Sequence, residues 1–127
     1  DKGELVGIFP ETIDTDEKFL SRGKTGMVRL ALASKVPIVP MGMYGGPNME
    51  GIRESIKYFL KRKEVRQHIR IGEPIDLSRF YGRVITYELL ADATIEVMQA
   101  IAKLCGKEYV YTKRQWMEDY RQHRKGD

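Results

Sequence analysis

The chain has 127 residues, 42% of them hydrophobic, and its formal net charge is +4 at pH 7. This length predicts one domain with a core of its own, and no stretch approaches the roughly 18 uninterrupted apolar residues of a membrane-spanning helix. The single cysteine, Cys105, excludes an internal disulfide and a cysteine-rich metal site, so no metal is expected.

The first part of the sequence predicts a strand, a helix and a second strand. Leu5 to Phe9 is a short apolar run that stops at Pro10, as a buried strand often does. Residues 24–33 carry apolar side chains at helical spacing, and residues 36–43 are a second apolar run. Strand, crossover helix and strand indicate a βαβ unit with parallel strands. The predicted fold class is α/β, with a partly parallel sheet flanked by helices.

Further along the chain, two more helices and one more strand are expected. Asn48 is suited to cap a helix that reaches Phe59, and residues 64–71 predict a strand. Residues 78–82 are expected to be a connector. The longest predicted helix runs from Thr86 to Cys105 and stops at Gly106. Its apolar stripe is expected to belong to the core and consists of Leu90, Ala93, Val97, Ile101 and Leu104.

A possible anion site lies at the start of the first predicted helix. Glu11 follows the end of a predicted strand, where ligands bind in open α/β sheets. The N–H groups and dipole of the helix start attract anions, Lys24 adds a point charge, and Gly26 permits close approach. Each feature alone is more often an ordinary loop or surface residue, so the prediction depends on their combination.

Two segments rich in charge leave alternatives open. One basic stretch comprises Lys57, Lys61, Arg62, Lys63, Arg66 and Arg70, and it could face anionic headgroups, the phosphates of a CoA donor, or only solvent. The end of the chain, residues 107–127, mixes Tyr109, Tyr111, Trp116 and Tyr120 with many charges. Docking on the domain or disorder is favoured for it, ahead of binding at a membrane surface. No recognisable motif supports a nucleic-acid partner.

Four separated segments together resemble a known family. Phe9-Pro10-Glu11, Lys24-x-Gly26 and Val36-Pro37-Ile38-Val39-Pro40 resemble, in order and spacing, the later conserved blocks of the glycerophospholipid acyltransferases, of which lysophosphatidate acyltransferase is typical. The stretch from Gly72 to Asp76 resembles a further block. The similarity runs from about Leu5 to about Leu104. It implies that residues 1–106 are the C-terminal part of an acyltransferase domain and that residues 107–127 are a basic aromatic tail.

The resemblance implies a reaction and its partners. The parent enzyme would transfer an acyl group from acyl-CoA or acyl carrier protein to the hydroxyl of a lysophosphatidate-like acceptor. No cofactor is implied beyond this donor substrate. A place at the cytoplasmic face of a membrane is implied as well, either peripheral or anchored. The substrate-binding residues implied are Phe9, Pro10, Glu11, Thr12, Arg22, Lys24, Gly26, Pro37 and Pro40.

The sequence departs from the family pattern in two places. The family's general base belongs to a His-x-x-x-x-Asp pair, and neither His68 nor His123 is followed by an aspartate at that distance. We therefore expect this chain to be the C-terminal half of an acyltransferase, to lack catalytic residues of its own, and to self-associate when isolated. Asp14 stands where the family has an arginine, so Arg22 and Lys24 would supply the charge, or the acceptor differs. The alternative is a non-catalytic module that binds lipid or phosphate.

Overall fold

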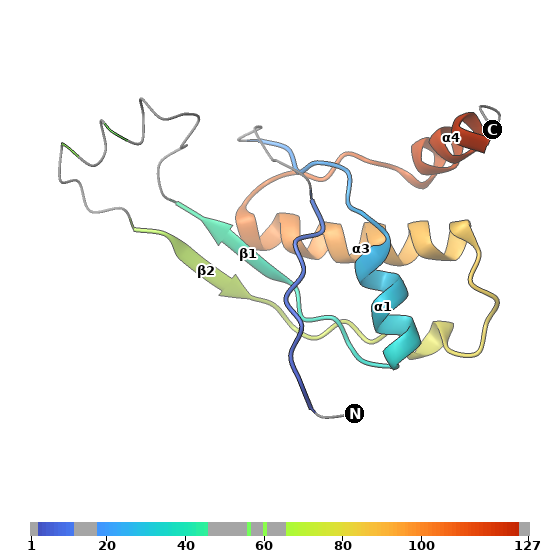
Figure 1. Ribbon diagram of the computed structural model, residues 1–127. Helices are drawn as coiled ribbons and strands as arrows, with labels where there is room; N and C mark the ends of the chain where they lie inside the picture. The colour runs from blue at the N-terminus through green and yellow to red at the C-terminus, as the bar shows by residue number, and fades with distance from the viewer. Residues whose placement is uncertain (1–2, 12–17, 46–55, 57–59, 61–65, 125–127) are drawn as a thin grey trace.

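The computed structural model describes residues 3–11, 18–45, 56, 60 and 66–124 (Figure 1). One helix and a small sheet pack on a long central helix, and the C-terminal helix lies near the start of that long helix. The elements within the described residues are α1 (Gly26–Ser34), β1 (Met41–Tyr44), β2 (His68–Ile71), a short 3-10 helix (Ser78–Phe80), α3 (Tyr87–Cys105) and α4 (Lys113–Arg124). Most of the helix predicted from Asn48 lies outside the described residues.

Helix α3 is the centre of the core, and its predicted extent is confirmed. Thr86 caps its start by accepting a hydrogen bond from the Leu89 N–H, and Gly106 ends it in the left-handed conformation that glycine adopts readily. The buried side chains of α3 meet those of α1 in one cluster. This cluster comprises Leu20, Met27, Val28, Ala31, Leu32, Leu77, Leu89, Leu90, Ala93, Val97, Met98, Ile101 and Ala102.

Helix α1 confirms the helix predicted over residues 24–33, with a start two residues later. Its buried residues Met27, Val28, Ala31 and Leu32 form the apolar face that packs on α3. Lys35 follows the helix with φ of 52°, and its N–H bonds to the Ala31 carbonyl. In Figure 1, α1 starts in front of α3 and runs down from it.

The sheet differs from the prediction, because its two strands are antiparallel. Met41 pairs with Ile71 and Met43 with Ile69, which confirms the predicted strand at 64–71 over its last four residues. The pairing continues at Ile38 and Ile75, which exchange backbone hydrogen bonds of 3.1 and 2.8 Å. Residues 38–44 thus pair with residues 68–75, which come later in the chain. The structure is a mixture of helices and a small sheet, which is compatible with the α/β class.

The strand predicted at Leu5–Phe9 is wrong for this structure. These residues have no regular structure, and the Leu5 and Phe9 side chains are 101% and 83% exposed. A short apolar run becomes a strand only when a partner strand accepts its hydrogen bonds. Strand β1, which follows α1, pairs with β2. The parallel pairing expected between residues 5–9 and this strand is therefore not formed. The one parallel bridge among the described residues joins Phe19 to Glu108.

The two faces of the sheet have different environments. Gly42 lies against the end of α3, so close to Leu104 that a side chain has no room there. The opposite face carries Met41, Met43, Ile69 and Ile71, and each of these is about half exposed or more. Alternation along a strand places such residues on one side. Among the described residues, none of the helices is long and apolar enough to cross a membrane.

Candidate functional site

Two chain segments that carry predicted site residues are joined by hydrogen bonds. The Pro10 carbonyl accepts the Lys24 N–H at 2.8 Å, and the Glu11 carboxylate accepts the Ser21 N–H at 3.0 Å. The structure therefore brings Pro10 and Glu11 beside the segment that leads into α1. Glu11 acts here by holding the backbone of that segment, which is a positioning role. Thr12 lies outside the described residues, and the Phe9 side chain points into solvent.

The start of α1 has the features of an anion site. Thr25 precedes the helix without making a side-chain cap, and the first turn contains no acidic residue. Its leading N–H groups are thus left without the partner that a cap normally provides. Gly26 is exposed, and a Cβ placed on it would meet nothing within 4 Å. Lys24 is exposed beside this helix start and makes no ion pair within the described part of the chain.

Arg22, the other predicted cation, is held by the C-terminal half of the chain. One of its guanidinium nitrogens lies 2.5 Å from the Asp119 carboxylate, and the other donates to the Tyr87 hydroxyl at 2.6 Å. The guanidinium carbon lies 4.1 Å from the centre of the Trp116 ring, within the range of a cation–π contact. Arg22 and Lys24 are only two positions apart in the sequence, but only Lys24 is left exposed to solvent at the helix start.

Gly23, which lies between Arg22 and Lys24, packs against α3. A Cβ on Gly23 would lie 2.5 Å from Met98 Cγ and 3.2 Å from Thr94 Cγ2, so only glycine fits without movement of the methionine. The Tyr109 phenol lies near the Gly23 backbone and the Trp116 indole. Burial raises the pKa of Tyr109, and these polar neighbours act against that shift. Within the described part of the chain, the Tyr109 hydroxyl and the Trp116 N–H are buried without a hydrogen bond.

The other predicted site residues lie in a different part of the molecule. Pro37 is exposed, whereas Pro40 is buried and accepts the Gly72 N–H through its carbonyl at 2.9 Å. This contact places the predicted block 72–76 directly beside the predicted block 36–40. Both blocks therefore have a structural role in extending the sheet. Pro40 also lines an open groove along α3, whereas Pro37 does not.

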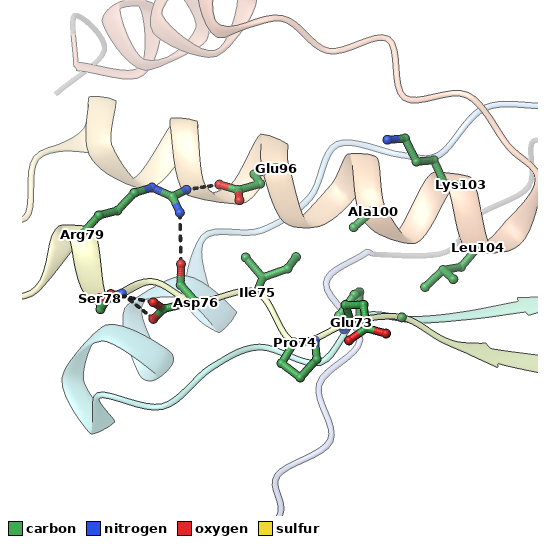
Figure 2. Close-up of a pocket in the computed structure, with 12 residues that line it drawn as sticks. Glu73, Pro74, Ile75, Asp76, Ser78, Arg79, Glu96, Ala100, Lys103 and Leu104 are labelled. Atoms are coloured by element: carbon green, nitrogen blue, oxygen red, sulfur yellow. Dashed lines mark hydrogen bonds and ion pairs between the residues drawn. The ribbon is translucent and has the colours of Figure 1, made fainter.

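Figure 2 shows this groove, which has a volume of about 700 Å³. Arg79 lies at one end, where it pairs with Glu96 and donates to the Asp76 carbonyl at 3.0 Å. The Asp76 carboxylate accepts the Ser78 hydroxyl and N–H at 2.6 and 2.8 Å, and these bonds lower the pKa of Asp76. The complete lining is Pro40, Gly72, Glu73, Pro74, Ile75, Asp76, Ser78, Arg79, Glu96, Ala100, Lys103 and Leu104.

Sequence reasoning missed the α3 side of this groove. Glu96, Ala100 and Lys103 recur at spacings of four and three residues, which places them on one face of the helix. This spacing was the one sequence signal that could have indicated the groove. It is a weak signal, because the polar face of a long helix is ordinarily exposed to solvent. None of the residues near the start of α1 lines the groove.

Histidines and acidic residues are the usual catalytic bases and metal ligands of proteins. His68 is exposed on β2 and stacks on Tyr44 with ring centres 5.1 Å apart. The side chain of His123 is outside the described residues. Over the described ranges, no group of three or more His, Cys, Asp and Glu side chains is arranged to hold a metal ion.

Comparison with known proteins finds a match to one family model. The family model described as Acyltransferase matches residues 1–44, which is 44 of the 127 residues. No curated protein and no solved structure matches the chain. The family match confirms the resemblance predicted from Phe9-Pro10-Glu11, Lys24-x-Gly26 and the block 36–40, all of which it contains. The predicted block 72–76 lies beyond it.

Residues 1–44 are therefore similar to the acyltransferase family, and the general reaction that the match supports is acyl transfer. The matched segment includes α1, its open helix start and the loop contacts of Pro10 and Glu11. It also includes β1, whose last residue is Tyr44.

Proposed function

We propose that this chain supplies the acceptor-binding part of an enzyme that acylates a lysophosphatidate-like acceptor. The observation that supports it most is the open start of α1, with Lys24 and Gly26 exposed there, inside the segment that matches the acyltransferase family. The acceptor's phosphate would accept hydrogen bonds from the leading N–H groups of α1. Lys24 would add a positive charge beside it, and Gly26 would leave space for the phosphate oxygens.

The proposed reaction moves an acyl group from a thioester to an alcohol. The acceptor hydroxyl attacks the thioester carbonyl of acyl-CoA or acyl carrier protein, a general base removes the hydroxyl proton, and the thiol leaves. The family's His-x-x-x-x-Asp pair does not occur in this sequence. We therefore assign the base to residues outside these 127, and the present chain holds the acceptor and not the proton. No cofactor is required beyond the donor substrate.

The charge at the site refines this proposal. Asp14 stands at the family's arginine position, and the guanidinium of Arg22 is engaged by Asp119 and Tyr87. Lys24 is consequently the cation that we assign to the phosphate. A single lysine is a compact point charge and does not provide the two-pronged hydrogen bonding of an arginine.

A membrane surface is the proposed location of the reaction. The net charge of +4 favours contact with anionic headgroups, and the acceptor itself is an amphipathic lipid. We propose peripheral or anchored association at the cytoplasmic face, with residues 1–106 as the acyltransferase part and residues 107–127 as the tail that docks on it. No nucleic-acid partner is proposed.

Acyl transfer from a labelled acyl-CoA to lysophosphatidate tests the proposal, measured for this chain and for the full product of its gene. In the full product, Lys24→Ala should raise the acceptor KM about tenfold, as expected for loss of a charge-assisted contact. Lys35→Gly is the matched control, because it removes the same charge at the opposite end of α1 and glycine suits the φ of 52°. An acceptor KM unchanged by Lys24→Ala would contradict the assignment.

The second candidate function is a binding module without catalysis. It is favoured by the missing His-x-x-x-x-Asp pair together with Asp14 in place of arginine. This alternative predicts that the full gene product binds lysophosphatidate-containing vesicles but transfers no acyl group to any lysophospholipid. Transfer by the full product would exclude it.

A further inference from the structure

The Arg22 side chain joins the segment before α1 to two elements far away in the sequence. Its partners are Asp119 and Trp116 of α4 and Tyr87 at the start of α3, which are 97, 94 and 65 residues away in the chain. The Arg22 side chain is 29% exposed, so these contacts are partly shielded from solvent. A guanidinium that is hydrogen-bonded on two nitrogens and stacked on an indole has little freedom left.

Helix α4 is anchored independently of Arg22. Trp116 is 2% exposed, and the Tyr120 ring stacks on Tyr87 with centres 4.1 Å apart. Lys113 bridges two acidic residues of α3, Glu88 at 2.8 Å and Asp92 at 2.9 Å. Because these contacts hold α4 on α3, Asp119 is presented to Arg22 from a fixed support. The orientation of Arg22 thus depends on α4 more than α4 depends on Arg22.

The segment that contains Arg22 is the one that presents Lys24. Leu20 N–H bonds to the Glu108 carbonyl at 3.0 Å, and the Ser21 and Lys24 N–H groups bond to Glu11 and Pro10. Gly23 lies against α3. Arg22 supplies the side-chain contact in the middle of this segment. Loss of that contact should loosen the backbone on both sides, including the Lys24 N–H.

We propose that Asp119 is a positioning residue that holds Arg22 and, through it, the segment from Ser21 to Lys24 at the start of α1. The inference rests on the proposed function to the extent that this segment binds the acceptor. Asp119 does not touch the acceptor; its carboxylate orients the guanidinium, and the restrained backbone presents Lys24. The C-terminal helix is then a working part of the site, although the family match ends at residue 44.

Amide hydrogen exchange of the chain without ligand is the first test. Asp119→Asn removes the carboxylate charge with little change of shape, and protection of the Ser21 and Lys24 amides should fall about fivefold, as expected for loss of one partly exposed ion pair. Asp119→Glu keeps a carboxylate and should restore most of the protection. Asp92→Asn is the matched control, because it weakens a contact of α4 with α3 and leaves the partners of Arg22 in place.

The sole tryptophan, Trp116, reports whether the variants still fold with α4 docked. If its emission stays that of a buried indole in Asp119→Asn while protection at Ser21 and Lys24 is unchanged, the proposal is overturned. The same holds if Asp92→Asn lowers this protection equally, because the effect would then be general loosening of α4.

Kinetics of the full gene product provide the second test. Asp119→Asn should raise the acceptor KM several-fold and leave kcat nearly unchanged, since the residue acts on acceptor binding and not on the reacting atoms. A lower KM in this variant would overturn the proposal, because it would mean that Asp119 keeps Arg22 away from the acceptor. The exchange test needs no substrate, so absence of acyl transfer by the wild type would refute the proposed function without altering the exchange result.

Discussion

Replacing Gly42 by alanine should destabilise the protein through the contact between β1 and α3. The added Cβ would lie 2.5 Å from Leu104 Cβ and 2.8 Å from both the Leu104 carbonyl carbon and the Cys105 nitrogen. Two of these three atoms belong to the α3 backbone, which cannot rotate away as a side chain can. Overpacking of this kind costs about 1–3 kcal/mol, and the reduced entropy of the unfolded chain returns roughly 0.5–1 kcal/mol of it.

The net loss should be about 1–2 kcal/mol, which corresponds to a decrease in Tm of roughly 3–10 °C for a domain of this size. Urea denaturation followed by circular dichroism measures the free energy of unfolding, and a scanning melt gives the Tm. Gly26→Ala is the control, because its Cβ would meet nothing within 4 Å at the start of α1. That variant should gain about 0.5 kcal/mol. If Gly42→Ala is as stable as the wild type, the sheet does not pack on α3 as described.

Three further predictions concern α3 and the exposed sheet face. Thr86→Ala removes the cap of α3 and should cost about 1 kcal/mol in urea denaturation, whereas Thr86→Ser should cost much less. The ion pair with Lys113 holds the pKa of Glu88 in the folded protein below its ordinary value. The pair therefore stabilises the protein fully at a pH above the pKa that Glu88 has in the unfolded chain. This stabilisation is lost as the pH falls through the lower pKa of the folded state. Stability measured from pH 7 down to 3 should therefore fall less steeply in Glu88→Gln, and an identical slope would argue against the pair. Met43→Lys and Ile69→Lys should each lower the self-association expected of the isolated chain, because both side chains lie on the exposed face of the sheet. Sedimentation velocity measures this, and a wild type that stays monomeric at high concentration would contradict it.

Helices α1 and α3 were predictable because their signals are local. Apolar residues at helical spacing and residues suited to the helix ends occur within a few positions of one another, and α1 and α3 followed them closely. The cap at Thr86 and the stop at Gly106 are read from single residues. The same is true of Lys24 and Gly26, whose place at a helix start follows from the pattern of the next ten residues.

The sheet was less predictable because pairing is not a local property. Residues 5–9 and 36–43 both read as apolar strands, and nothing in either run specifies its partner. The structure pairs residues 38–44 with 68–75 in the antiparallel sense and leaves residues 5–9 without a ladder. The local pattern was compatible with a parallel crossover, but residues 68–75 provide the hydrogen bonds to residues 38–44.

The sequence by itself determined the extent of α1 and α3 and contained the segment, residues 1–44, that matches the acyltransferase family model. It also placed two cations, Arg22 and Lys24, just before α1. Only the tertiary structure decided how these residues are used. Arg22 and Lys24 look equivalent in the sequence, yet Asp119, Tyr87 and Trp116 engage the first and leave the second exposed. The physical reason is that a charge near a helix start follows from neighbouring residues, whereas its partners come from wherever the folded chain brings opposite charges and aromatic rings together.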